Sequence, residues 1–122
     1  MAVQVRKFPS TPLGTHVATD ATPTSTHQTL TAGAATIYAV HIDNTANSTK
    51  AYLKFYNTGS PTVGTTEPSV VLMAPASGSL QYSFLEGIIL GAACTYACVN
   101  TGGTSGTNDL DQAVPITIIV DL

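Results

Sequence analysis

The residues of this sequence with the most reactive side chains are three histidines and two cysteines. His16, His27 and His41 fall in three separate segments, and no partner for metal binding or acid–base work lies near His16 or His41. Neither Cys94 nor Cys98 lies beside a histidine, and no serine occupies a Gly-x-Ser-x-Gly turn. We therefore predict that the chain is not an enzyme, that it has no catalytic residue, and that the histidines are exposed or hydrogen-bonded.

The two cysteines lie four residues apart in the segment Ala-Cys-Thr-Tyr-Ala-Cys-Val, which reads as a β-strand. Residues four apart on a strand share a face, but they are about 13 Å apart, beyond the roughly 7 Å limit between bridged Cα atoms. We predict that Cys94 and Cys98 are unpaired, reduced and buried, where thiols act as small hydrophobic side chains. No metal site is predicted, because no further Cys or His stands nearby at zinc-ligand spacing.

Two polar segments near the C-terminus contain groups that bind ions in other proteins. Asn108-Asp109-Leu110-Asp111 offers two carboxylates for calcium, but it lacks the remaining ligands and the glycine of a calcium loop. We interpret Asp109 instead as the cap of one helical turn over residues 108–113. Thr101–Gly106 has the glycines of a phosphate cradle, but no lysine or helix follows it, so a flexible loop is predicted and no cofactor.

Five tyrosines could line a sugar-binding face. They are Tyr38, Tyr52, Tyr56, Tyr82 and Tyr96. Tyrosines at strand spacing more often belong to a core or an interface, because a buried ring contributes a large apolar area. The core or interface interpretation is therefore preferred, and a carbohydrate-binding module is kept as an alternative.

The composition of the chain is unusually poor in charge. Only 9% of the 122 residues are charged, against about 25% in ordinary soluble domains, and 20 are threonine. Threonine favours strands, and its hydroxyl is less costly to desolvate than a charged group. The bias fits either a β-rich protein or one that lies against other proteins. With a net charge of −3 there is no basic field, so nucleic-acid binding is not expected.

No apolar run reaches the length of about 18 residues that a membrane-spanning helix needs. The longest, from Gly87 to Ala93, is much shorter, and the N-terminus lacks the apolar core of a signal peptide. We therefore expect no membrane association. The protein is expected to be made and kept in a cytoplasm until it assembles or is released.

Alternation of apolar and polar residues is the main structural signal. It is clearest over Thr36–Asn57, where two runs flank the polar loop Asp43–Lys50 and predict an antiparallel hairpin with Tyr38, Val40 and Ile42 on one face. Similar runs follow to the end of the chain. The predicted core residues shared between two sheets are Leu53, Phe55, Tyr82, Phe84, Ile116 and Ile118.

Seven or eight short strands separated by turn residues, with no periodic helix, predict an all-β fold. The expected architecture is an antiparallel β-sandwich of jelly-roll or immunoglobulin-like connectivity over residues 27–122. Residues 1–26 contain three prolines and little apolar periodicity, which predicts an extended N-terminal arm with a short edge strand at Val3 and Val5. The arm is either disordered or ordered only on a partner.

Several of these segments resemble a known group of proteins. Ile42-Asp-Asn-Thr-Ala-Asn, Tyr52-Leu-Lys-Phe-Tyr, Pro61-Thr-Val-Gly-Thr-Thr and Cys98-Val-Asn-Thr-Gly-Gly-Thr are similar to parts of small β-sandwich virion proteins of tailed bacteriophages, including cyanophages. The resemblance runs from about Thr36 to Val120 and carries over no functional residue. It implies a capsid cement or decoration protein, often trimeric, that binds the outside of the head where capsomers meet.

The expected function is therefore that of a non-enzymatic capsid decoration protein, made in the host bacterial cytoplasm and located on the capsid surface of the virion. Its expected partners are the major capsid protein or other virion proteins, and two further copies of itself in a homotrimer. A neck, tail or fibre protein is the alternative within the virion. Apolar residues opposite the core set favour an interface, because exposed apolar patches usually mark one. These residues are Val71, Met73, Ala97, Val99 and Ile119.

Overall fold

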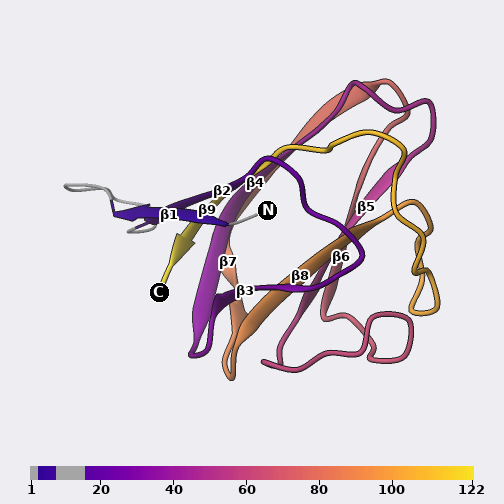
Figure 1. The fold of residues 1–122 in the computed structure, drawn as a ribbon. Helices are drawn as coiled ribbons and strands as arrows, with labels where there is room; N and C mark the ends of the chain where they lie inside the picture. Colours follow the sequence, from indigo (N-terminus) through magenta and orange to yellow (C-terminus); the bar gives the residue numbers. More distant parts are fainter. Residues whose placement is uncertain (1–2, 8–15) are drawn as a thin grey trace.

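The computed structural model describes residues 3–7 and 16–122, and in them it contains nine strands and no helix (Figure 1). The predicted all-β sandwich is confirmed. The strands are β1 (Gln4–Lys7), β2 (His16–Asp20), β3 (Gln28–Thr31), β4 (Ala35–Asn44), β5 (Ala51–Tyr56), β6 (Val70–Ala74), β7 (Gly78–Leu90), β8 (Cys94–Val99) and β9 (Ile116–Asp121).

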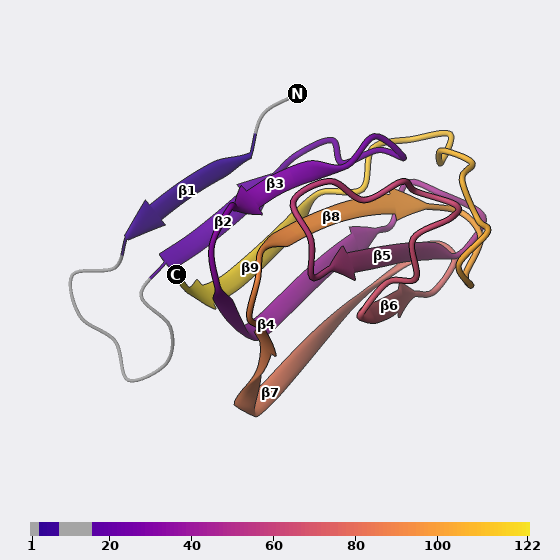
Figure 2. The same ribbon diagram turned by 90° about the horizontal axis from the view of Figure 1, so that it is seen from below.

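The strands form two antiparallel sheets that face each other across the core (Figures 1 and 2). The larger sheet has the order β1-β2-β9-β4-β7, and the smaller sheet has the order β3-β8-β5-β6. Every neighbouring pair in both sheets runs antiparallel. The edge strands are therefore β1 and β7 in the larger sheet and β3 and β6 in the smaller sheet.

The predicted hairpin over Thr36–Asn57 is wrong, although both of its strands exist. β4 pairs with β7 and β9 in the larger sheet, whereas β5 pairs with β6 and β8 in the smaller one. The polar loop between them carries the chain from one sheet to the other. Buried amide side chains fix this crossing, because Asn44 Nδ2 donates to Thr49 O at 2.8 Å and Asn47 Nδ2 donates to Asn44 Oδ1 at 3.0 Å.

A β-bulge changes which residues of β4 face the core. Ile37 lies opposite Ile88 and Ala39 lies opposite Ser83, so four residues of β7 oppose the single residue Tyr38. The shift buries Ile37 and leaves Tyr38 half-buried, which corrects the prediction that Tyr38 shares the core face with Val40 and Ile42.

Glycine is required within this bulge, at Gly87. Its φ is 79°, in the left-handed region that side chains disfavour. A Cβ at this position would also collide with Thr36 Cγ2 and contact the Tyr38 ring. The bulge geometry therefore depends on this residue.

Four of the six predicted core residues are almost fully buried: Leu53, Phe55, Ile116 and Ile118. The other two, Tyr82 and Phe84, are half-buried and stack with 6.4 Å between ring centroids. The Tyr82 hydroxyl donates to Met73 O at 2.6 Å and accepts from Met73 N at 3.3 Å. Tyr82 thus joins β7 of the larger sheet to β6, the edge strand of the smaller sheet.

The expected arm over residues 1–26 is corrected where the structure describes it. β2 lies between β1 and β9 within the larger sheet, and Ala18 and Asp20 are buried. The Tyr96 hydroxyl donates to Asp20 Oδ2 at 2.7 Å, which ties this segment to β8 of the opposite sheet. The edge strand expected near Val3 and Val5 is confirmed as β1, while residues 1–2 and 8–15 of the predicted arm lie outside the described residues.

The outer face of the smaller sheet is covered by the chain's own loops. Ala97 and Val99 were expected to be exposed on this face, but both are buried. Thr95 Oγ1 donates to Thr58 O at 2.8 Å beneath the loop after β5. Three other apolar residues were predicted to lie opposite the core set. Val71 is exposed, and Met73 and Ile119 are half-buried. Apolar residues on both faces of β8 thus form two internal layers.

Candidate interaction surface

The histidines are spread over the fold. His16 lies on β2, His27 precedes β3 and His41 lies on β4 in the larger sheet. Among residues 3–7 and 16–122, no three His, Cys, Asp or Glu side chains gather in a way that would hold a metal ion. The three histidines therefore do not form a common site.

The cysteines are where the sequence predicts them. Cys94 and Cys98 are unpaired and almost completely buried on β8, as predicted. Burial raises the pKa of each thiol to about 12. Since the thiolate is the reactive form, both groups are inert at neutral pH.

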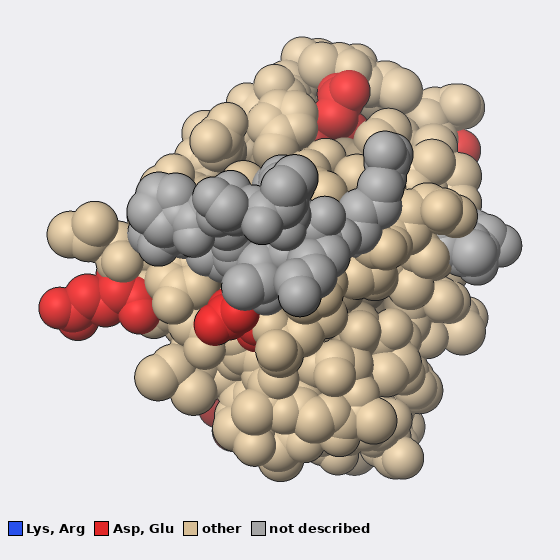
Figure 3. Space-filling model, turned by 90° about the vertical axis from the view of Figure 1, so that its left-hand side faces the viewer, with Lys and Arg blue, Asp and Glu red and all other residues tan. Residues whose placement is uncertain are grey.

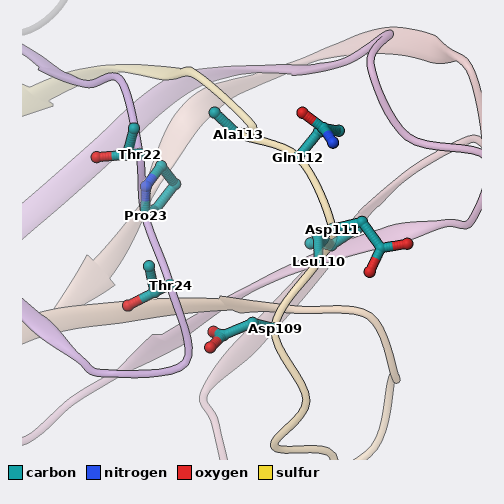
Figure 4. A pocket seen from close by; sticks show the side chains of 8 residues that line it. All are labelled: Thr22, Pro23, Thr24, Asp109, Leu110, Asp111, Gln112 and Ala113. Carbon is teal, nitrogen blue, oxygen red and sulfur yellow. The ribbon is translucent and has the colours of Figure 1, made fainter.

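The two carboxylates of the segment 108–111 do not form a shared ligand set (Figure 4). The Asp109 side chain points towards Thr24, and its Oδ1 accepts a hydrogen bond from Ser25 N at 2.6 Å, whereas the Asp111 side chain points away. The cavity between these segments, of about 200 Å³, is also lined by Pro23 and Leu110. No helical turn follows Asp109, so its predicted role as a helix cap is wrong. It instead joins the C-terminal loop to the segment before β3.

The glycine-rich loop, residues 101–106, binds the side-chain ammonium group of Lys54. The Nζ atom of Lys54, on β5, donates to Gly103 O at 2.5 Å and to Gly106 O at 3.0 Å. The Lys54 side chain is completely buried, and this burial lowers the pKa of its amine. Backbone carbonyls, rather than amides, point into the loop here, so it is built for a cation. Sequence reasoning missed this contact, because a lysine on a strand normally indicates a solvent-exposed face.

The tyrosines do not form an exposed platform. Tyr56 and Tyr96 are fully buried, and the other three are half-buried. Burial raises the pKa of Tyr56, whose hydroxyl has no hydrogen-bond partner, and the Tyr52 ring packs beneath Gly102 in the glycine-rich loop. Stacking a sugar requires an exposed ring, so these positions favour the core interpretation.

Exposed apolar side chains collect at the edges of the sheets. In the described part of the chain the large ones are Val5, Val71, Leu80, Leu85, Ile89 and Leu122. All but Leu122 lie on the edge strands β1, β6 and β7. Leu85 is 88% exposed and Ile89 is 72% exposed, more than any other large apolar residue in the described part of the chain.

β7 has only part of the usual protection of an edge strand, namely its bulge at residues 84–87. Its 13 residues include no lysine, arginine or proline, the residues that commonly block pairing with another chain. Leu80, Leu85 and Ile89 project from it, and we call these three residues with the unpaired side of the strand the β7 edge. Such an edge favours contact with another polypeptide.

The outer face of the larger sheet is largely uncharged. The cross-strand pairs Ala39–Ser83 and His41–Gln81 face outwards beside Thr117. Ala39, His41, Gln81, Thr117 and Ile119 line a shallow cavity of about 120 Å³. Figure 3 shows the side on which the larger sheet lies in Figure 1. Among the described residues visible on it, Asp and Glu form small separate patches and none is Lys or Arg. We call this face, centred on Thr117 of the middle strand β9, the outer sheet face.

No protein-family model, curated protein or solved structure matches this chain. Within the described ranges, no helix is long and apolar enough to cross a membrane. The candidate contact surfaces among the described residues are the outer sheet face and the β7 edge. Both have the properties of protein–protein contact surfaces, because they combine apolar and hydroxyl groups with few charges.

Proposed function

We propose that the protein is a bacteriophage capsid cement or decoration protein, which binds the outside of the head as a homotrimer and stabilises contacts between capsid subunits. The resemblance of residues 36–120 to small virion proteins supports this function. The structural observation that carries it is the outer sheet face around Thr117 of the middle strand β9, where Ala39, His41, Gln81 and Ile119 present small, mostly uncharged groups. A sheet is already ordered before it binds, so it loses less conformational entropy on binding a flat shell than a flexible segment would.

A cement protein would stabilise the capsid because it binds the assembled shell more tightly than it binds free capsid subunits. A ligand that binds the lattice better than loose subunits stabilises the lattice by mass action. Three copies joined in a trimer act together through a high effective concentration, so each single contact can be weak. Threonine hydroxyls and short aliphatic groups suit this contact, because they desolvate at lower cost than charged groups.

The buried polar groups of the fold are used for structure. Asp20 binds the Tyr96 hydroxyl across the two sheets, and Lys54 holds the glycine-rich loop. Asn47 joins the loop after β4 to Gln112 through its side-chain amide. These bonds stabilise one arrangement of loops, which supports a structural role. A neck, tail or fibre protein would use the same surfaces, whereas the buried tyrosines disfavour a carbohydrate-binding module.

Co-sedimentation of the purified protein with heads that lack it tests the proposal. Thr117→Arg places a long charged side chain at the centre of the outer sheet face, far in strand order from both edges of the sheet. Thr65→Arg makes the same change on an exposed loop of the smaller sheet and serves as the control. We expect Thr117→Arg to weaken head binding by at least about tenfold, and Thr65→Arg to leave it unchanged. Failure of the wild-type protein to sediment with heads, or equal binding by both variants, would contradict the proposal.

A further inference from the structure

β6 is an edge strand of the smaller sheet whose composition favours pairing with another strand. Its five residues, Val70–Ala74, are all apolar and include no charged residue, proline or glycine. Short apolar segments of this kind pair readily with other chains when their backbone groups are free. Val71 is 39% exposed, so the strand is not fully covered by the rest of the chain. The composition of β6 therefore gives its edge no protection.

The hydroxyl of Tyr82 occupies backbone groups on the open side of β6. It donates to Met73 O at 2.6 Å and accepts from Met73 N at 3.3 Å. In an antiparallel ladder the N–H and C=O of one residue point to the same side, and this side alternates along the strand. Met73 and Val71 therefore face away from β5, whereas Leu72, opposite Leu53, faces it. We call the outward backbone groups of Val71 and Met73 the β6 edge.

The two bonds of the Tyr82 hydroxyl replace those of a neighbouring strand. A residue on an added antiparallel strand would exchange one N–H and one C=O with Met73, and the hydroxyl already satisfies both groups. We propose that Tyr82 is an autoinhibitory cap, which keeps the β6 edge from pairing with the β6 edge of a second copy of this chain. Antiparallel pairing of two β6 strands would bring only uncharged residues together, so no repulsion of like charges prevents it.

The position of the Tyr82 ring holds the hydroxyl in place. Figure 2 shows β6 and β7, the edge strands of the two sheets, along the same side of the sandwich. Tyr82 projects from β7 with its ring half-buried and stacked on Phe84, at 6.4 Å between ring centroids and 7° between ring planes. Tyr82→Phe keeps this ring and removes only the hydroxyl, so it isolates the cap from the packing.

Sedimentation velocity of the isolated protein tests the cap. Tyr82→Phe should form larger particles at a protein concentration at least about tenfold lower than any at which the wild type does, because the backbone groups of Met73 become available to another chain. Tyr38→Phe removes a hydroxyl from another half-buried tyrosine of the larger sheet and is the matched control, which should sediment as the wild type does. Equal sedimentation of Tyr82→Phe and the wild type would overturn the proposal.

A second substitution shows whether the larger particles form through the β6 edge. Val71→Lys in the Tyr82→Phe chain should restore the wild-type sedimentation, since a lysine on an edge strand blocks pairing. This lysine does not replace the lost hydroxyl, so the rescue would identify the edge, rather than lowered stability, as the cause. Gln81→Lys adds the same charge to the other edge strand, β7, and should not rescue. Rescue by both lysines, or by neither, would contradict pairing through β6.

Amide hydrogen exchange tests the cap directly at Met73. In the wild type the Met73 amide should be protected, and Tyr82→Phe should reduce this protection at least about tenfold while the Leu72 amide, which faces β5, keeps its own. Free exchange of the Met73 amide in the wild type would refute the cap. The inference goes beyond the proposed function and uses only the isolated protein, so a failure to bind phage heads would leave it standing.

Discussion

The contact between Lys54 and the glycine-rich loop makes a quantitative prediction for the variant Lys54→Met. Methionine has a similar length to lysine and fills the same space, but it cannot donate to Gly103 O or Gly106 O. Gly106 is buried, so its carbonyl is left without a partner at a cost of about 1–3 kcal/mol. Gly103 is exposed, and its carbonyl regains a bond to water.

Removal of the buried ammonium opposes this loss, because a charged amine is costly to hold away from water. We therefore expect Lys54→Met to lower the free energy of unfolding at neutral pH by less than the unpaired carbonyl alone would cost, by about 1 kcal/mol. Lys50→Met, at an exposed position, is the matched control and should change stability by less than about 0.5 kcal/mol.

The pH dependence of the difference between wild type and Lys54→Met isolates the amine. Burial lowers the pKa of Lys54 in the folded state below its ordinary value of 10.5. Between these two pKa values the unfolded chain binds more protons than the folded one, so the stability of the wild type rises with pH in that window. Below this window Lys54 is protonated in both the folded and the unfolded chain, and above it Lys54 is neutral in both, so stability no longer changes with its protonation.

Urea denaturation of both proteins at a series of pH values up to 10.5 measures this effect. The free-energy difference between wild type and Lys54→Met should grow as pH approaches 10.5, while the shared contributions of Tyr56 and Tyr96 cancel. A difference that stays constant over the whole range would refute the reasoning, because it would mean that Lys54 has an ordinary pKa in the folded protein.

Three further predictions concern the fold. Asn47→Ala should reduce stability by about 2–4 kcal/mol in urea denaturation, since its side chain makes three hydrogen bonds in a buried site; a loss below about 0.5 kcal/mol would contradict that role. Leu53→Ala should cost about 2–5 kcal/mol at a fully buried position, and an unchanged midpoint would show that the assigned face is wrong. Titration without reductant should find two thiols, Cys94 and Cys98, only after denaturation, and reaction in the native state would argue against their burial.

The sequence predicted strands and faces best where alternation is regular. Leu53 and Phe55 on β5, and Ile116 and Ile118 on β9, are buried as expected, because a period of two places alternate residues on one face. The same period contains no information about which strand lies alongside. β4 and β5 therefore looked like a hairpin, although they belong to different sheets.

Two features of the fold depend on contacts that are distant in sequence. The bulge at Tyr38 arises from three extra residues in β7, so alternation within β4 alone gives the wrong face. Lys54 does face away from the core, as its position in β5 indicates, but the loop that covers it comes about 50 residues later. Sequence patterns within one strand cannot show which loop folds back over it.

The sequence predicted an exposed apolar surface, but it did not predict which residues form that surface. Apolar residues opposite the core set indicated an interface, yet Ala97 and Val99 from that set are buried by loops. The most exposed apolar residues, Leu85 and Ile89, are not among that set. Their exposure follows from the position of β7 at the edge of the sheet, which only the strand order shows.

Cryo-electron microscopy of phage heads assembled with and without the protein is the most direct test of the proposed function. The difference map should show a trimer of β-sandwiches on the outer surface of the shell, at positions of local threefold symmetry, with the outer sheet face against the capsid. Density confined to the neck, tail or fibres, or no difference between the two maps, would contradict the proposal that this protein decorates the capsid.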